Sequence, residues 1–65
     1  MVSYEPFWNT LKEKNITQYS LVKNYKFSSA QLDRIRKNMY ISTRTIEHLC
    51  AILNCQPGDI IEVVD

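Results

Sequence analysis

The chain has 65 residues, of which 45% are hydrophobic, and a formal net charge of +1 at pH 7. That length allows a single domain over residues 1–65, and the apolar fraction excludes a disordered chain. No apolar run approaches the roughly 18 residues of a membrane span, and the N-terminus lacks the basic and apolar blocks of a signal peptide, so we expect a cytoplasmic protein.

The first predicted helix runs from about Pro6 to Lys14. Proline is favoured at the first helical position, and Glu5 just before it suits the positive end of the helix dipole. Phe7 and Leu11 are four residues apart and therefore share one face. We expect that face to pack against the rest of the domain.

Three further helix starts share one pattern, at Thr17, Ser28 and Ser42. Each hydroxyl residue follows an apolar residue and precedes a second apolar residue by four positions, which is typical of an N-cap closed by a hydrophobic staple. Thr17 and Ser28 are 11 residues apart, which leaves room for about seven residues of helix and a three-residue turn. This is the length of a helix-turn-helix.

The cap at Ser28 has the sequence of a capping box. In that motif the Ser28 hydroxyl accepts a hydrogen bond from the backbone N–H of Gln31, and the Gln31 side chain accepts one from the N–H of Ser28. In the helix that starts at Ser28 we expect Leu32 and Ile35 to point inward, and in the helix before it Leu21 and Val22.

Helix ends are predicted at asparagines, because the chain has only one glycine and asparagine is the next-best residue for the left-handed conformation that closes a helix. Lysines precede three of them and complement the negative end of the dipole, a structural role that competes with ligand binding. The four predicted ends are Lys14-Asn15, Lys23-Asn24, Lys37-Asn38 and Leu53-Asn54.

The helix after Ser42 has the clearest buried stripe, with Ile46, Leu49, Cys50 and Leu53 at helical spacing. Pro57-Gly58 then indicates a turn, or a short fifth helix ending near Ile61. The β-branched segment Ile60–Val64 suits a strand. We expect it to be buried against Val2–Tyr4, within the chain or across a dimer. The fold class is all-α, with four to five helices and possible short terminal strands.

Little in the chain points to catalysis or to a cofactor. Cys50 and Cys55 are expected to be thiols, and a zinc site would need more ligands than these two and the single histidine, His48. There is no paired-carboxylate cleft, no glycine-rich phosphate loop and no nucleophile with a plausible base, and His48 is expected at or near the surface. We therefore predict no enzymatic activity, no metal, no cofactor and no small-molecule substrate.

Two stretches of the sequence resemble a known family. Thr17–Val22 and Phe27–Ile35 resemble the helix-turn-helix of the Cro/lambda-repressor (XRE-type) DNA-binding domains, and Leu49–Ile60 resembles the ending of the short, single-domain bacterial members. The resemblance implies a lambda-repressor-like helical bundle that binds an operator in double-stranded DNA as a transcriptional regulator. The family usually has alanine where Val22 stands and glycine where Lys26 stands, so Lys26 would adopt a left-handed conformation that costs about 1 kcal/mol.

The resemblance also implies positions for the DNA contacts. The helix over about residues 29–37 would enter the major groove and helix two would lie across the backbone. The base-facing set carried over by position is Ser29, Ala30, Gln31, Asp33 and Arg34. The DNA backbone would be contacted by Gln18, Arg36, Lys37, Asn38, Tyr40, Thr43 and Arg44.

Several of these residues also have alternative roles in the sequence. Gln31 belongs to the capping box, Asp33 accepts from a cytosine or holds Arg34 or Lys37 in place, and Gln18 contacts a phosphate or orients a neighbour through its amide. Arg36 contacts phosphate or pairs with Glu47 or Asp33. The set as a whole would otherwise be a solvated face without a ligand.

The net charge is low for a DNA-binding protein, but four of the eight basic residues lie within eleven positions, from Arg34 to Arg44. That clustering favours a local basic surface. A homodimer is expected, because a single small reading head has limited affinity and family members commonly bind two-fold sites. The alternative function is a protein-interaction module, or an antirepressor-like regulator, that uses the same helices without binding DNA.

Overall fold

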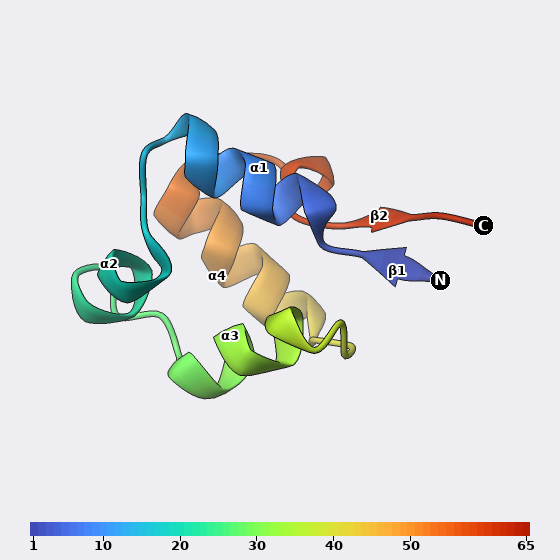
Figure 1. Cartoon of the computed structure of the whole chain (residues 1–65), viewed down its shortest axis with the longest axis horizontal. Helices are drawn as coiled ribbons and strands as arrows, with labels where there is room; N and C mark the ends of the chain where they lie inside the picture. Colours follow the sequence, from blue (N-terminus) through green and yellow to red (C-terminus); the bar gives the residue numbers. More distant parts are fainter.

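The computed structural model describes all 65 residues, and its four α-helices confirm the all-α prediction (Figure 1). A short 3-10 helix and two two-residue strands complete the chain. No helix is long and apolar enough to cross a membrane. The elements are β1 (Val2–Ser3), α1 (Glu5–Glu13), α2 (Gln18–Lys23), α3 (Ser29–Arg36), α4 (Thr43–Leu53), η1 (Pro57–Asp59) and β2 (Glu62–Val63).

The three predicted N-caps are confirmed. The hydroxyls of Thr17, Ser28 and Ser42 accept hydrogen bonds from backbone N–H groups three residues ahead, at 3.0, 3.3 and 3.2 Å respectively. Each bond satisfies one of the N–H groups that a helix start leaves without a partner. The first helix has no side-chain cap, and it begins and ends one residue earlier than predicted.

The reciprocal half of the predicted capping box is wrong. The side-chain oxygen of Gln31 accepts a hydrogen bond from the hydroxyl of Thr45 on α4, at 3.3 Å, and not from the backbone of Ser28. The physical reason is that α4 packs beside the first turn of α3 and offers a donor there. Gln31 therefore links α3 to α4 and does not complete the capping box of α3.

Left-handed asparagines close three of the four long helices, as predicted. Asn15, Asn38 and Asn54 have φ values of 59°, 57° and 52°. After each of them, the next backbone N–H donates to the carbonyl five residues back, the bond of a Schellman motif. The remaining helix also ends where predicted, because α2 ends at Lys23 with Asn24 as its C-cap, but Asn24 keeps a right-handed backbone with φ at −88°. The left-handed residue is Lys26, with φ at 61°, as the family resemblance implied.

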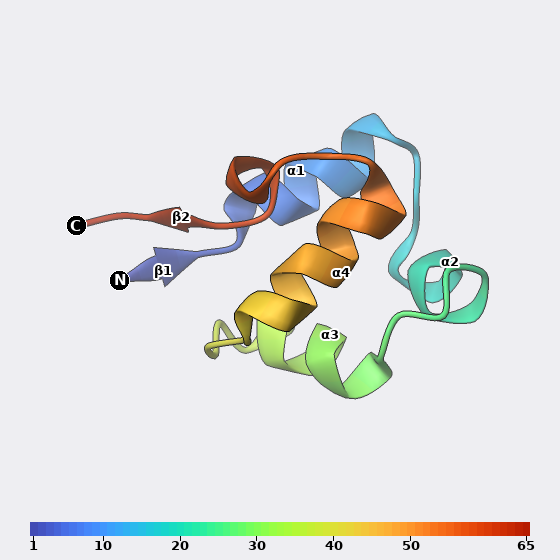
Figure 2. The ribbon, with the colours of Figure 1, turned by 180° about the vertical axis from the view of Figure 1, so that it is seen from behind.

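The core draws on every long helix and on both chain ends, and α4 lies between α1 and α3 in both views (Figures 1 and 2). Full burial of each large apolar side chain stabilises the fold by roughly 1.5–3 kcal/mol. The inward positions predicted from spacing on α1, α2, α3 and α4 are in or against this core, except Ile46, which is only half-buried and lies outside it. The buried apolar set is Tyr4, Phe7, Leu11, Leu21, Phe27, Leu32, Ile35, Leu49, Leu53 and Ile60.

The two chain ends pair within the chain. β1 and β2 are antiparallel, with Val2 opposite Val63 and Ser3 opposite Glu62. Burial of the C-terminal segment stops near Ile61, however, and Val63 is 78% exposed. The predicted burial of the whole segment is therefore wrong within one chain, because the ribbon of β1 and β2 projects away from the helices, with both termini at its tip (Figure 1).

The segment between α4 and β2 forms a short fifth helix that starts at Pro57, as one of the two alternatives allowed, but it is a 3-10 helix and ends at Asp59, two residues before the expected end. The Asp59 carboxylate accepts a hydrogen bond from the backbone N–H of Gln56 at 3.0 Å and closes this turn. The Thr10 hydroxyl on α1 donates to the carbonyl of Asp59 at 2.7 Å, which fixes the turn against α1. Cys50 and Cys55 are free thiols, as predicted.

Candidate nucleic-acid interface

The turn between α2 and α3 is built around Lys26 and Phe27. The left-handed backbone of Lys26 reverses the chain, and the next residue, Phe27, is buried with 3% of its surface exposed. The N–H of Phe27 donates to the carbonyl of Leu21 at 3.1 Å, which closes the turn onto α2. The result is a short helix, a tight turn and a second helix, in the arrangement of a helix-turn-helix.

One side of α3 faces away from the core. Leu32 and Ile35 are buried, and at 100° per residue the opposite ridge carries Ala30, Asp33 and Lys37, with Arg34 beside them. Of the predicted base-facing residues, Ser29 and Ala30 are exposed, whereas Gln31, Asp33 and Arg34 are half-buried. The helix therefore presents its first turn most openly.

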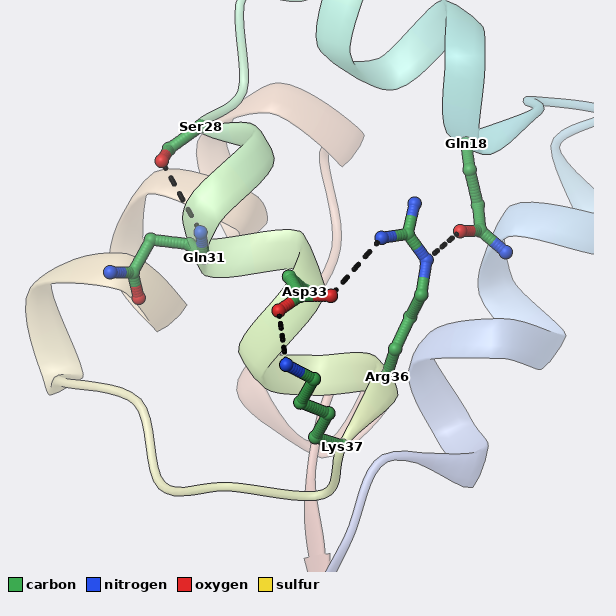
Figure 3. A network of polar contacts seen from close by, with 6 residues as sticks. All are labelled: Gln18, Ser28, Gln31, Asp33, Arg36 and Lys37. Atoms are coloured by element: carbon green, nitrogen blue, oxygen red, sulfur yellow. Dashed lines mark hydrogen bonds and ion pairs between the residues drawn. The ribbon is translucent and has the colours of Figure 1, made fainter.

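An acidic residue of this ridge, Asp33, holds two cations at the end of α3 (Figure 3). The carboxylate of Asp33 lies 3.0 Å from the Lys37 ammonium and 3.7 Å from the Arg36 guanidinium. The side chains of all three residues are about half exposed or more, so each pair contributes little to stability, roughly 0–1 kcal/mol. Of the alternatives left open by the sequence, Asp33 pairs with Arg36 and Lys37, and Arg36 does not pair with Glu47.

Gln18 orients Arg36 from the start of α2. Its amide oxygen accepts a hydrogen bond from Nε of Arg36 at 2.7 Å, which links the first residue of α2 to the last residue of α3 (Figure 3). Because Arg36 contacts Gln18 through Nε and Asp33 through one terminal nitrogen, the remaining donors of its fork stay available. The amide oxygen of Gln18 thus orients a neighbour, which is one of the two roles that the sequence allowed.

The loop from α3 to α4 is anchored at three consecutive residues. The Asn38 amide donates to the carbonyl of Val2 at 3.0 Å, and the Tyr4 hydroxyl donates to the carbonyl of Met39 at 2.5 Å. The Arg34 guanidinium donates twice to the carbonyl of Tyr40, at 3.0 and 2.7 Å. These contacts fix the loop that joins the two surfaces predicted to contact DNA.

Tyr4 makes its anchor from a buried position, with only 2% of its surface exposed. Burial raises the pKa of its phenol above the ordinary 10.0, an effect that the Ile41 backbone and the Arg34 charge partly offset. The hydroxyl therefore stays protonated and can donate to Met39 across the neutral pH range. Sequence spacing gave no signal for this role, because the two residues are 35 positions apart.

Three of the remaining predicted backbone contacts, Tyr40, Thr43 and Arg44, lie in or just before the first turn of α4. Tyr40 is 72% exposed, and Thr43 and Arg44 are exposed in the first helical turn. Ser42 caps the N–H of Thr45, so the first N–H groups of α4 are free to meet an anion at the positive end of the dipole. Lys37, at the end of α3, is exposed as well.

Charge is segregated along the molecule, which explains how a net charge of +1 accommodates a basic surface. Residues 18–48 contain six Lys or Arg and two Asp or Glu, a net of +4, whereas the rest of the chain contains two and five, a net of −3. Four of the five acids of the second group line a shallow groove of about 370 Å³ along α1 and η1: Glu5, Glu13, Asp59 and Glu62. A polyanion would therefore be attracted to α2, α3 and the start of α4, and repelled from α1.

His48, the one histidine, lies exposed on α4 with its ring centroid 5.9 Å from that of Phe27. It packs beside the turn of the helix-turn-helix, in keeping with the expected surface position. No group of three or more His, Cys, Asp or Glu side chains has the geometry of a metal site.

Comparison with known proteins agrees with this geometry. The sequence model of the Cro/C1-type HTH DNA-binding domain matches residues 7–65. Among solved structures, the transcriptional regulator VanUg is similar, with a TM-score of 0.86 and 30% sequence identity over 97% of this chain and 84% of the other. A search of curated proteins found no significant match. This chain therefore belongs to the Cro/C1-type helix-turn-helix DNA-binding domains.

Proposed function

We propose that this protein is a transcriptional regulator that binds double-stranded DNA sequence-specifically, with α3 in the major groove. The observation that carries the proposal is the anchored loop between α3 and α4. Hydrogen bonds hold each of Asn38, Met39 and Tyr40 in place, so the open face of α3 and the start of α4 form one preorganised surface. A surface fixed before binding loses less entropy when DNA binds. The similarity to the regulator VanUg supports the same role.

In this arrangement the first turn and outer ridge of α3 read the bases. Ser29 and Ala30 are exposed enough to approach base edges, and Ala30 suits a thymine methyl group. The Gln31 amide is held by Thr45 through its oxygen, so its NH₂ group is the part free to donate to a base. The Asp33 carboxylate either accepts a hydrogen bond from a cytosine or mainly holds Lys37 and Arg36 in place.

Arg34 takes a different place in this proposal from the one that family position implied. Two of its donors are engaged by the carbonyl of Tyr40, which leaves it poorly disposed for a bidentate contact to guanine. We assign it the positioning of the loop that carries Tyr40. Asn38 has a similar role, because its amide is engaged by Val2.

The DNA backbone is then contacted by the exposed groups at the edges of this surface. Arg36, oriented by Gln18, and Lys37 lie at one end of α3, and the first turn of α4 supplies free N–H groups beside Thr43 and Arg44. Tyr40, in the loop between α3 and α4, is 72% exposed and can contribute its hydroxyl. Such contacts fix the register of the reading helix without selecting a sequence.

Selection of bound duplexes from a random pool tests the proposal. We expect enrichment of a short motif, and we expect Ala30→Ser to change the preferred base at one position without lowering the free energy of unfolding. Ala51→Ser, the same change at an exposed position of α4 outside the proposed surface, is the matched control and should leave the motif unchanged. Recovery of no motif, with binding to all duplexes equal, would contradict sequence-specific reading.

A protein-binding role for the same surface is the alternative, and two exposed tyrosines favour it. Tyr19 on α2 is 70% exposed and Tyr40 is 72% exposed, and tyrosine is enriched in protein interfaces. The same pool experiment separates the two functions, because an interaction module would retain no duplex at any salt concentration.

We further propose that the protein acts as a homodimer on a two-fold operator, with half-sites about one helical turn apart. A single α3 covers only a few base pairs, and two copies related by a two-fold axis would double the contacts.

A further inference from the structure

We infer that Cys50 and Cys55 form a two-thiolate site for Cu(I), a soft cation that accepts two ligands. They are the only cysteines of the chain, and both are free, half-buried thiols at the end of α4. The inference goes beyond the proposed function, and its test needs no DNA. It departs from the expectation of no metal, which was argued for zinc and its four ligands.

The backbone at the end of α4 brings the two cysteines together. The helix closes at the left-handed Asn54, and the N–H of Cys55 donates to the carbonyl of Cys50 at 3.1 Å, the long bond of a Schellman motif. This bond alone keeps the two Cα atoms within about 7 Å of each other. Side chains at these two positions of the motif commonly make contact, so both sulfur atoms can reach one ion.

The same motif at the ends of the other helices shows that closure of a helix does not require cysteine. At the end of α1, the N–H of Ile16 donates to the carbonyl of Leu11 at 2.9 Å, and both positions carry aliphatic side chains. At the end of α3 the two positions carry Arg34 and Met39. Only at the end of α4 do both positions carry a thiol. The pairing of the thiols is therefore more than the helix end needs.

The pair is open to an ion from solvent. Cys50 and Cys55 line a shallow groove of about 480 Å³ beside α4, together with Ile46, Glu47 and Pro57. Both thiols also pack against the edge of the core without being fully buried. An ion in the groove could thus reach both sulfur atoms, while the apolar groups around them limit access of water to it.

The number and softness of the donors select the ion. No group of three or more His, Cys, Asp or Glu side chains has the geometry of a metal site, so an ion that requires four ligands finds only two. Thiolates are soft ligands, and Cu(I) prefers them and is satisfied by two. We therefore expect Cu(I) to bind far more tightly than Zn(II).

Binding must displace a proton from each thiol. Burial, followed by the charges of Cys50 and Asp59, raises the pKa of the Cys55 thiol above its ordinary value, and the charge of Lys14 partly offsets this. The charged groups that line the two grooves beside the pair are Glu13, Lys14, Glu47 and Asp59. One Cu(I) and two thiols give a dithiolate complex with one negative charge and two released protons, without a change of oxidation state. The affinity should therefore rise with pH until both thiols are ionised.

Competition with a colorimetric Cu(I) chelator, without oxygen and with both thiols first titrated as free, measures the affinity of the full chain. We expect one Cu(I) per chain. Cys50→Ala and Cys55→Ala should each lower the affinity by at least about a hundredfold, to that of the double variant, because one thiol cannot chelate. Met39→Leu, which removes an exposed thioether elsewhere, is the matched control and should bind as the wild type does. Circular dichroism checks that each variant is folded.

Two further measurements define the site. X-ray absorption at the copper edge should show two sulfur neighbours, and sedimentation equilibrium should show the same oligomeric state with and without copper. The inference is overturned if a folded single variant binds Cu(I) as tightly as the wild type, if two chains share one ion, or if Zn(II) binds as tightly as Cu(I). None of these outcomes bears on DNA binding, so the proposed function stands or fails separately.

Discussion

Substitution of Arg34 by alanine distinguishes the loop-anchoring role from direct base reading. In the structure, Nε and Nη2 of Arg34 both donate to the carbonyl of Tyr40, at 3.0 and 2.7 Å. A hydrogen bond from a charged group contributes about 1.5–3 kcal/mol in a buried setting. Because Arg34 is half-buried and both donors share one acceptor, we expect Arg34→Ala to lower the free energy of unfolding by about 1–2 kcal/mol.

Arg34→Ala should also weaken DNA binding, by the same factor for every duplex sequence. In Arg34→Ala the duplex must order the loop at Tyr40 as it binds, and this ordering costs about 1–2 kcal/mol of the binding free energy. The affinity should therefore fall roughly five- to thirtyfold. Arg34→Lys is the matched control, because it keeps the charge but replaces the planar fork by a single ammonium, and we expect an intermediate effect.

Urea denaturation and titration against a panel of duplexes, each changed at one base pair, measure the two effects. Equal weakening across the panel together with a loss of stability supports the anchoring role. Unchanged stability with relaxed preference at a single base pair would refute it, and would make Arg34 a base-reading residue as its family position implies.

Three other predictions follow from local contacts. Lys26→Gly should raise the free energy of unfolding by about 0.5–1 kcal/mol in urea denaturation, because it relieves a left-handed backbone, whereas Lys26→Ala should give no gain. Burial raises the pKa of Tyr4 in the folded state, so the stabilisation from its phenol is complete below about pH 10 and is lost as the pH rises further. Tyr4→Phe should therefore flatten the alkaline decline of the melting temperature. An unchanged decline would disprove this role of Tyr4. Gln18→Ala should change the free energy of unfolding by less than about 0.5 kcal/mol. It should weaken binding to all duplexes severalfold, because it releases Arg36. A change in base preference would count against the orienting role of Gln18.

Helix boundaries were predictable because their signals are local. An N-cap depends on a hydroxyl and an N–H three residues away, and the same chemistry recurs at Thr17, Ser28 and Ser42. The left-handed residue of the turn was harder to place from the residues alone. Asn24 has the better intrinsic propensity, but burial of Phe27 requires the chain to reverse directly before it, at Lys26.

The contacts that shape the candidate site were not predictable from spacing. Tyr4 and Asn38 reach partners 35 and 36 positions away, and only the packing of β1 beside the end of α3 brings them together. The sequence predicted a local partner for the Gln31 amide in the capping box, but in the structure its oxygen accepts a hydrogen bond from the hydroxyl of Thr45 on another helix. Side-chain partners of this kind depend on the tertiary arrangement, whereas exposure of the α3 ridge followed from its helical period.

The salt dependence of duplex binding tests the central claim most directly. The proposed surface places three cations, Arg36, Lys37 and Arg44, at phosphates of each half-site, which corresponds to a slope of log affinity against log salt of about −2.7 for one chain and about −5 for a dimer. The DNA-binding account predicts a slope in that range, reduced by about one for each chain that carries Arg44→Ala. Absence of duplex binding even at low salt, or a slope near zero, would contradict it.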